Sequence, residues 1–463
     1  MVITKFLCKI ADNSNVMGKN VNIIGAGLVG SLLSIYLAKK GYKINIYERR
    51  PDMRTAKISA GKSINLALSD RGWRGLEGVG IADEIRKIAI PMYGRFIHHK
   101  DSSTAFQPYG KNDQAIYSVS RAEINMRLMD LAEQKGGVKI HFNERCTQIN
   151  RATLESQFIN EETQKTSSAT SDLIFGSDGA FAASRLNMQL TSDRFEYNQH
   201  YISAGYKELI IPPGPDGSFL IEKNALHIWP RGNFMMIALP NMDGNFTCTL
   251  FLPFEGERSF EKLKTKEEVK KFFDEEFPDA VPLMPTLLDD FMHNPVSSLV
   301  TVKCFPWTFD NKVALIGDAA HAIVPFFGQG MNCGFEDCVV LNELIDKHKE
   351  DWNKIMPEYQ TLRKPDGDAI ADLAVANFIE MRDKTADPKF LLQKKIEARF
   401  NSKYADKWIP LYSMVTYSPD IRYSTALKEG QKQEAIMQKI MAIPGIENKW
   451  DTEEVEKEIL KNI

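Results

Sequence analysis

The chain has 463 residues, 43% of them hydrophobic and 26% charged, which is typical of a globular protein with two or three domains. Lysine plus arginine (58) against aspartate plus glutamate (61) leaves a net charge of −3, which argues against nucleic acid as a partner. No stretch approaches the roughly 18 uninterrupted apolar residues of a membrane-spanning helix, and no basic run indicates a membrane surface.

The cysteines and the N-terminus give expectations about compartment and metal binding. Six cysteines are scattered along the chain and suggest no disulfide framework, so we expect a reducing, cytoplasmic compartment. Only Cys333 and Cys338 lie close together, and their spacing matches no zinc pattern, so no metal site is expected. Residues 1–16 read as an extension, with Met17 as an alternative start.

The first predicted unit spans residues 21–49 and reads as strand, glycine turn, helix and strand. In the turn, Gly25 permits a tight bend, Gly27 lets a pyrophosphate approach the backbone, and Gly30 lets the helix pack on the strand. The helix N-terminus offers unpaired N–H groups to phosphates. Glu48 ends the second strand, where a carboxylate accepts from a ribose hydroxyl, as in FAD or NAD. A plain glycine-rich turn is the less favoured interpretation.

Two further apolar strands, in 171–180 and 312–322, also end in glycine and aspartate. Asp178 and Asp318 would lie at the carboxyl ends of these strands, where they can reach the hydroxyls of a ribityl chain. Either aspartate alone could equally cap a helix. Three such strand ends on one sheet edge favour a bound flavin.

The predicted secondary structure of the rest of the chain changes along its length. Runs rich in β-forming residues fill 93–121 and 200–256, and helical patterns dominate from about 334. We therefore expect an α/β fold with an inserted antiparallel sheet and a helical C-terminal region. The predicted units are a discontinuous Rossmann-like FAD-binding domain (20–75, 118–190 and 300–345), a β-rich substrate domain (76–117 and 191–299) and a helical region (346–463).

Three fingerprints in this order, GxGxxG, a central DG and a GD motif, resemble the single-component flavin-dependent aromatic hydroxylases. Longer runs such as "SINLALSDRG", "LHIWPRGNFMMIALPNMDGNF" and "GDAAHAIVPFFGQGMNCGFEDC" extend the similarity over about 20–425. The resemblance implies bound FAD, with NADPH as a transient co-substrate and O₂. Transferred to this sequence, the family's cofactor positions are Gly25, Gly27, Val29, Gly30, Glu48, Arg49, Ala67, Arg121, Asp178, Asp318, Gly330, Met331 and Asn332.

The resemblance is strongest to one branch of the family, whose substrate is an amino acid with an aniline ring. It assigns the carboxylate to Arg95 and Tyr109, since an arginine grips a carboxylate bidentately and a tyrosine adds a donor. It also assigns Asn377 and Tyr412 to the substrate. Asn377 has independent support, because it falls within an apolar helical stripe where an amide must find a partner. Without the resemblance, Arg95 would read as an exposed strand charge.

The implied reaction is hydroxylation beside the ring amine through a flavin C4a-hydroperoxide, which must be kept from water. Pro325, Phe326 and Phe327 are predicted to form the apolar catalytic wall, with Met236 and Phe246 as candidates for the opposite wall. A helix opening near Gly334 would direct its N-terminus at the flavin. His321 is not assigned as a base, because the amine already activates the ring.

Three alternatives remain open at this point. They are a related hydroxylase acting on another aromatic acid, a flavoprotein reductase of lipids without oxygen chemistry, and a flavin-binding scaffold without turnover. The C-terminal hydrophobic anchor of the eukaryotic enzymes is absent from the pattern, so no membrane anchor is expected. The C-terminal helices are expected to close over the substrate cavity. The oligomeric state, a homodimer included, and the choice of NADPH over NADH are left open.

Overall fold

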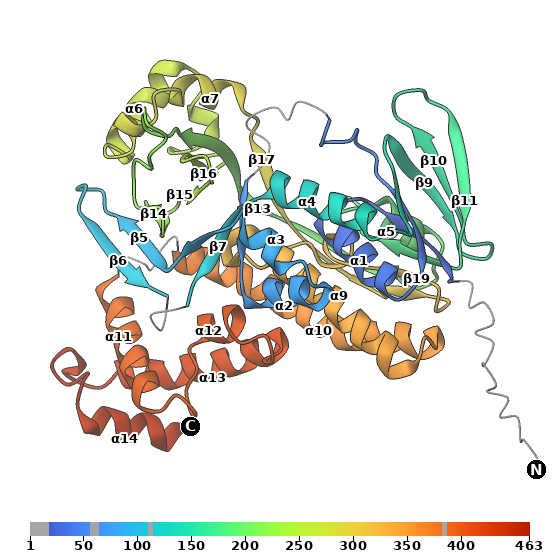
Figure 1. Ribbon diagram of the computed structural model, residues 1–463. Coiled ribbons are helices and arrows are strands. Elements are labelled where there is room, and N and C mark those ends of the chain that lie inside the picture. Colours follow the sequence, from blue (N-terminus) through green and yellow to red (C-terminus); the bar gives the residue numbers. More distant parts are fainter. Residues whose placement is uncertain (1–17, 56–63, 110–113, 382–386) are drawn as a thin grey trace, which may run out of the picture.

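The computed structural model describes residues 18–55, 64–109, 114–381 and 387–463 (Figure 1). The predicted extension before Met17, and Met17 itself, lie outside the described residues. The central element is a six-stranded sheet in which all neighbours are parallel except β18 and β19. Its order is β18 (Thr308–Phe309), β19 (Val313–Leu315), β12 (Leu173–Gly176), β1 (Asn20–Ile24), β2 (Lys43–Tyr47) and β8 (Val138–His141).

Helices pack against this sheet, and its central strands are therefore buried along almost their whole length. The apolar helix α1 (Leu28–Lys39) follows β1 and contacts both α4 (Arg121–Gln134) and α9 (Gly330–His348). Helix α2 (Asp70–Val79) also packs on α9, and α3 (Ala82–Arg86) follows it. The buried interior of this unit is a single apolar cluster that spans the sheet and these helices.

Two small sheets border the central one. Strands β9 (Glu144–Asn150), β10 (Glu155–Asn160) and β11 (Thr166–Thr170) form an antiparallel meander that projects from the molecule (Figure 1). Strands β3 (Asn65–Leu68), β7 (Ile116–Ser120) and β4 (Ile90–Met92) form the other sheet, with β7 in the middle.

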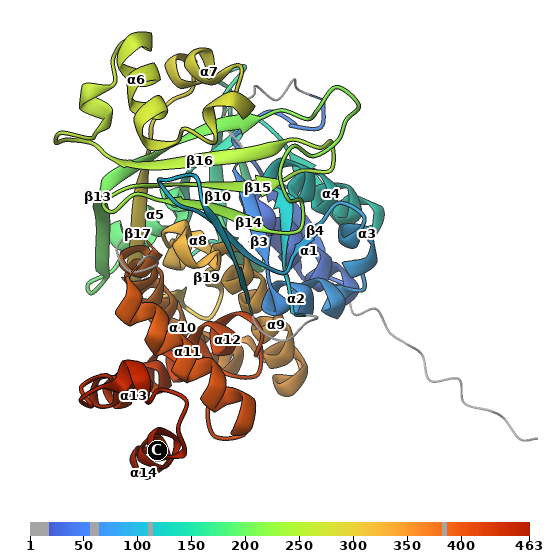
Figure 2. The same ribbon diagram turned by 90° about the vertical axis from the view of Figure 1, so that its left-hand side faces the viewer.

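A seven-stranded sheet forms the second large layer, and its order is β17, β13, β16, β15, β14, β5 and β6. Helices α6 (Lys266–Glu276) and α7 (Leu287–His293) lie on one side of it, and the C-terminal helices lie on the other (Figures 1 and 2). Each side has its own apolar core. The strands are β17 (Ser297–Phe305), β13 (Glu196–Ile211), β16 (Phe246–Pro253), β15 (Met235–Pro240), β14 (Leu226–Pro230), β5 (Gly94–His98) and β6 (Thr104–Pro108).

The C-terminal part is helical, as predicted. It contains α10 (Trp352–Ile379), α11 (Pro388–Lys403), α12 (Leu411–Thr416), α13 (Tyr423–Met441) and α14 (Glu453–Asn462). No helix within the described residues is both long enough and apolar enough to cross a membrane. The predicted fold class, an α/β sheet with an antiparallel insert and a helical C-terminal region, is confirmed.

One helix boundary differs from the prediction. Helix α9 begins at Gly330, with Gln329 as its N-cap, and not near Gly334. Gly330, Met331 and Asn332 therefore form its first turn instead of a preceding loop. A glycine lowers helix propensity by only about 1 kcal/mol relative to alanine, which the packing of α9 against α1 and α2 can outweigh.

Candidate active site

The three glycine-containing strand ends lie side by side, because β1, β12 and β19 are parallel neighbours. Ile24 pairs with Gly176, which in turn pairs with Leu315, so the loops after these residues leave the same edge. The Ser177 N–H donates to the Ile24 carbonyl at 2.9 Å and fixes the first two exits to each other. In open α/β sheets this edge is where ligands bind.

The first turn has the geometry of a phosphate-binding loop. Gly25 has a φ of 102°, and a Cβ there would lie 2.7 Å from the Ser177 carbonyl oxygen. A Cβ on Gly30 would lie 2.1 Å from the Gly25 carbonyl oxygen. At Gly27, by contrast, a Cβ would meet no heavy atom within 4 Å. Helix α1 starts here with no side-chain cap, so its first N–H groups face open space, as a bound pyrophosphate requires.

Glu48 is buried beside this turn at the end of β2. One carboxylate oxygen accepts from the Ala26 N–H at 2.9 Å, and the other accepts from Nε of Arg50 at 2.8 Å. Burial disfavours the charge, but these hydrogen bonds outweigh it and lower the pKa of Glu48 below its usual value. Arg50, and not the exposed Arg49, is thus the arginine that holds the predicted ribose-binding carboxylate.

The two aspartates of the other strand ends differ. Asp178 accepts from the Ser184 backbone N–H at 3.0 Å and from the Ser184 hydroxyl, so it caps the start of α5 (Ala183–Leu190). Asp318 is partly buried in the first turn of α8 (Asp318–His321), and within the described part of the chain its carboxylate has no partner. Asp318 is therefore free to accept a ligand hydroxyl, whereas Asp178 would have to share its carboxylate with the helix.

Close packing brings α1, α8 and α9 together at Val29. A Cβ on Gly317 would lie 2.9 Å from Cγ2 of Val29, and a Cβ on Gly334 would lie 2.5 Å from the same atom. Gly317 also has a φ of 62°, which disfavours other residues. Two glycines thus let the GD loop and α9 approach the phosphate-binding helix.

The last predicted cofactor positions surround Asn332. Its amide donates to the carbonyls of Ala67 and Gly328, at 2.8 and 2.7 Å, and its carbonyl accepts from the Ser69 N–H at 2.9 Å. Asn332 thus ties β3 to the turn before α9, and both of its amide N–H groups are already used. Met331 is buried in the same turn, while Arg121 is exposed at the start of α4.

The residues present fit FAD. The open glycine turn at an uncapped helix suits its pyrophosphate, and buried Glu48 suits its ribose. On the same edge, the Asp318 carboxylate has no partner among the described residues. The turn from Pro325 to Phe327 and the first turn of α9 continue from this edge toward the seven-stranded sheet.

Arg95, Tyr109 and Tyr412 come from distant parts of the chain and meet at one place. The Tyr109 and Tyr412 rings stack at 5.3 Å, and the Arg95 guanidinium lies 5.0 Å from the Tyr412 ring centre and 5.7 Å from that of Tyr109. Nε of Arg95 and the Tyr109 hydroxyl are buried without a hydrogen-bond partner among the described residues. Unpaired buried donors are expensive, so this cluster is suited to an anionic ligand.

Asn377 holds the apolar turn in place. Its amide donates to the Phe326 carbonyl at 2.7 Å and contacts the Met381 sulfur at 3.3 Å. Both N–H groups are thereby used, which leaves only the amide oxygen for a ligand. The predicted substrate residue is thus first of all a support for Phe326.

Phe326 and Phe327 lie in an aromatic cluster, as predicted for an apolar wall. Phe326 packs on Phe251 at 4.9 Å and on Phe378 at 4.1 Å, and Phe327 stacks on Tyr412 at 5.6 Å. The cluster joins the seven-stranded sheet to α10. No local sequence pattern points to Phe251 or Phe378, which reach the cluster only through tertiary packing.

The prediction that Met236 and Phe246 form the opposite wall is wrong. Both belong to the apolar core beneath α6 and α7, on the other face of the sheet. Side chains alternate along a strand, so Met235 and Ile237 point toward the Phe326 cluster instead. A strand buried on both faces shows no alternation in its sequence, and the face could not be read from it.

The comparisons with known proteins decide the family. A family model described as "FAD binding domain" matches residues 19–374. Proteins named kynurenine 3-monooxygenase are 52% identical in Christiangramia forsetii, covering 96% of this chain and 99% of that protein, and 43% identical in Sus scrofa, covering 92% and 89%. The chain belongs to the kynurenine 3-monooxygenase family. The predicted FAD-binding monooxygenase is therefore confirmed.

Solved structures of lower identity share the fold of the kynurenine 3-monooxygenase family. The tetrameric form of 2-methyl-3-hydroxypyridine-5-carboxylic acid oxygenase has a TM-score of 0.65 at 19% identity, covering 85% of this chain and 98% of that one. HpxO from Klebsiella pneumoniae, complexed with FAD, has a TM-score of 0.64 at 16% identity and covers 84% and 97%. At these identities they support the fold alone.

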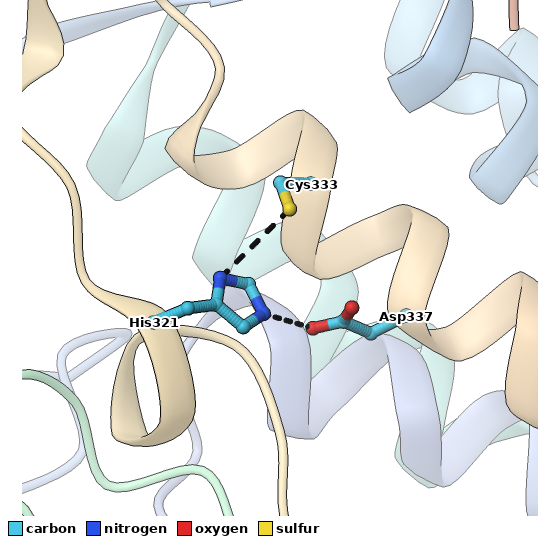
Figure 3. Close-up of side chains that lie close together, drawn as sticks. All are labelled: His321, Cys333 and Asp337. Carbon is cyan, nitrogen blue, oxygen red and sulfur yellow. Dashed lines mark hydrogen bonds and ion pairs between the residues drawn. The ribbon is translucent and has the colours of Figure 1, made fainter. Parts of the chain in front are cut away.

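Behind the cofactor edge lies a buried ion network that the sequence did not predict. Figure 3 shows His321 between Cys333 and Asp337. Nε2 of His321 lies 2.6 Å from the Asp337 carboxylate, which also accepts from the Gly317 N–H at 3.0 Å and from Nε of Arg363 at 2.7 Å. Burial opposes both charges, but the pairing raises the pKa of His321 and lowers that of Asp337.

His321, Cys333 and Asp337 have the composition of a metal site, with ligand atoms within 4.8 Å of one another. The Asp337 carboxylate is already shared by three donors, and the Arg363 guanidinium also lies 3.3 Å from the Cys333 sulfur. A cation would have to displace that guanidinium, so the network is better described as a support for the Gly317 loop of this family.

Arg71 extends the network to the C-terminal helices. It pairs with Glu336 at 2.5 Å, and Glu336 pairs with Arg363 at 2.6 Å. On its other side, Arg71 donates to the Val415 carbonyl at 2.7 Å and to the Met414 carbonyl at 3.1 Å. Helix α12, which carries Tyr412, is therefore tied to the same ion network as the Gly317 loop.

Proposed function

We propose that the protein is an FAD-dependent monooxygenase that hydroxylates L-kynurenine to 3-hydroxykynurenine, with NADPH as reductant and O₂ as oxidant. The observation that carries the proposal is the meeting of Arg95, Tyr109 and Tyr412 beside the Phe326–Phe327 turn. Buried donors of this cluster have no partner among the residues that the structure describes. Relatives that are named kynurenine 3-monooxygenase and are 43–52% identical support the same substrate.

The residues of this cluster suit each part of L-kynurenine. The α-carboxylate would accept from Arg95 and Tyr109, whose Nε and hydroxyl lack partners among the described side chains. The Asn377 amide oxygen is left over as an acceptor for the α-ammonium. The aniline ring would lie among the Phe327 and Tyr412 rings.

Bound FAD supplies the electron transfer and the activation of oxygen. The chain's own residues orient the substrate and exclude water. Pro325, Phe326 and Phe327 form the apolar wall, and Asn377 fixes it through the Phe326 carbonyl. The N-terminus of α9 places its positive dipole end at the same turn, where it stabilises negative charge. The ring amine already donates electron density, so no protein base is assigned, and buried His321 remains paired with Asp337.

We propose that Gly25, Gly27, Glu48 and Asp318 hold the cofactor directly, and that Val29, Gly30, Ala67 and Asn332 act through packing. A cytoplasmic location is also proposed. Its support is that Cys146, Cys248, Cys304, Cys333 and Cys338 are all buried free thiols, as in a reducing compartment.

The deciding experiment measures NADPH oxidation by the FAD-loaded protein with and without L-kynurenine, and identifies the product by mass. We expect L-kynurenine to accelerate oxidation and to gain one oxygen atom. If another aromatic acid does so and kynurenine does not, the chain is a related hydroxylase with a different substrate.

Arg95→Ala tests the carboxylate site. Loss of a hydrogen-bonded charge pair is worth roughly 1.5–3 kcal/mol, so we expect KM for L-kynurenine to rise at least about tenfold while FAD content stays unchanged. FAD content is read from the flavin absorbance of the purified protein. Loss of FAD without an effect on KM would show that Arg95 serves the cofactor instead.

A further inference from the structure

Tyr417 is a buried residue next to the proposed substrate site. The proposed function assigns it no role. It follows α12 directly, five residues after Tyr412, and is 8% exposed. Its ring lies 6.1 Å from the Tyr412 ring in an edge-to-face arrangement. It therefore belongs to the same aromatic layer as the residues proposed to hold the carboxylate.

The Tyr417 hydroxyl has no hydrogen-bond partner within the described ranges of the chain. The neighbouring Thr416 is 1% exposed, and its hydroxyl is unpaired as well. With Nε of Arg95 and the Tyr109 hydroxyl, four buried polar atoms of this one region have no hydrogen-bond partner among the described residues. Native proteins leave few such groups, and a bound ligand is one way to satisfy them.

The surroundings of Tyr417 connect the two proposed sites. It packs in one apolar cluster with Tyr109 and Tyr412 on the substrate side and with Ala67 of β3 on the cofactor side. Burial, first of all, and the nearby Tyr412, Tyr109 and Asp70 raise the pKa of Tyr417 above its usual value, so the hydroxyl keeps its proton. The Arg95 guanidinium acts on Tyr417 in the opposite direction, as a smaller cause that lowers this pKa, so the two groups lie within electrostatic reach of each other. A protonated phenol in such surroundings is suited to an anionic acceptor.

We propose that Tyr417 is a specificity-determining residue whose hydroxyl donates to the substrate carboxylate together with Arg95 and Tyr109. The inference rests on the proposed function and deepens it. The residue selects amino acids over decarboxylated amines, because without the carboxylate its hydroxyl stays unpaired in a buried pocket.

Tyr417→Phe removes the hydroxyl and keeps the ring. The dissociation constant for L-kynurenine, from titration of the FAD-loaded protein followed by the flavin spectrum, is expected to rise about tenfold or more. KM should rise with it while kcat changes little, since the bond is present before and during the reaction. For kynuramine, which lacks the carboxylate, the dissociation constant should stay within about twofold.

Tyr42→Phe is the matched control. The Tyr42 hydroxyl is also buried and unpaired among the described residues, but it lies beside Trp352, in the apolar core of the six-stranded sheet. We expect this variant to bind L-kynurenine like the wild type.

An unchanged dissociation constant for L-kynurenine in Tyr417→Phe would overturn the inference. An equal loss of affinity for kynuramine would overturn it as well, because the Tyr417 hydroxyl would then contact the aromatic part of the ligand and not the carboxylate. If kynuramine binds too weakly to measure, the L-kynurenine titration and the KM and kcat values decide alone. Wild-type protein that neither binds nor hydroxylates L-kynurenine would instead contradict the proposed function, and this inference with it.

Discussion

His227 is held neutral by its hydrogen bonds. Its Nε2 lies 2.7 Å from the Glu222 carbonyl, which can only accept, so Nε2 carries the proton. Its Nδ1, 2.9 Å from Nε2 of His98, must then accept from His98. Nδ1 of His98 lies 2.7 Å from the Asp279 carboxylate, which ends this buried series of hydrogen bonds.

The pH dependence of stability tests this arrangement. Burial, with His98 as a lesser cause, lowers the pKa of His227 from 6.5 to about 4. Between these pH values His227 is protonated in the unfolded chain but not in the folded chain. The free energy of unfolding therefore falls as the pH drops from 6.5 to 4. The expected loss is up to about 3 kcal/mol.

Urea unfolding at several pH values between 7 and 4, with wild type and His227→Gln, measures that loss. The variant lacks the titrating group, so its stability should decline less over this window, although it starts lower at pH 7. Parallel pH profiles for the two proteins would show that His227 is not responsible.

At the scale of elements, the contact of α1 with α8 and α9 depends on glycine. Gly334→Ala would place a methyl group 2.5 Å from Cγ2 of Val29, whose branched side chain has little freedom to move. We expect a loss of about 1–3 kcal/mol in the unfolding free energy of the FAD-free protein, with weaker FAD binding. Thermal or urea unfolding and FAD titration give both values.

The double variant Val29→Ala with Gly334→Ala provides the control. Removing the Val29 methyl groups makes room for the new one, so the double variant should be more stable than the sum of the two single losses predicts. Strict additivity would mean that the two positions do not touch.

At the scale of the whole molecule, Arg71 joins the cofactor part to the C-terminal helices. Its guanidinium pairs with Glu336 and lies 4.0 Å from the Tyr423 ring centre. It also donates to two carbonyls of α12 and to the Ser418 carbonyl in the loop that follows α12. Arg363 continues the connection from Glu336 to Asp337 and the Gly317 N–H. One buried chain of ion pairs thus positions both the cofactor loop and the loop that carries Tyr417.

The substitution Arg71→Met should loosen the C-terminal helices from the FAD-binding part of the molecule. Breaking a buried ion pair costs about 3–5 kcal/mol, and here it also frees several carbonyls. We expect proteolysis to cut the chain between α11 and α13 much faster than in the wild type, while the FAD-binding part stays folded and keeps its flavin. Limited proteolysis with mass analysis locates the cuts, and Arg71→Lys should show an intermediate rate. An unchanged cleavage pattern would mean that the helices are held by apolar packing alone.

Local sequence patterns were enough to predict much of the fold, and the proposed cofactor edge rests on the same kind of pattern. The glycine spacing at Gly25, Gly27 and Gly30, the acid at Glu48 and the strand-ending motif at Asp318 each depend on residues a few positions apart. Their roles follow from turn geometry and helix capping, which are local. The change from runs of β-forming residues to helical patterns likewise predicted the antiparallel insert and the C-terminal helices.

Tertiary structure alone decided what these local pieces touch. Arg71 meets Val415 across 344 positions, and Asn377 meets Phe326 across 51. The buried face of β15 was also undetermined, because both of its faces are apolar. The sequence by itself determined turns, caps and strand ends, since these depend on near neighbours. Only packing decided the ion network, the aromatic cluster around Phe326 and the position of the Tyr417 hydroxyl, because these contacts join residues that are distant in the sequence and close in space.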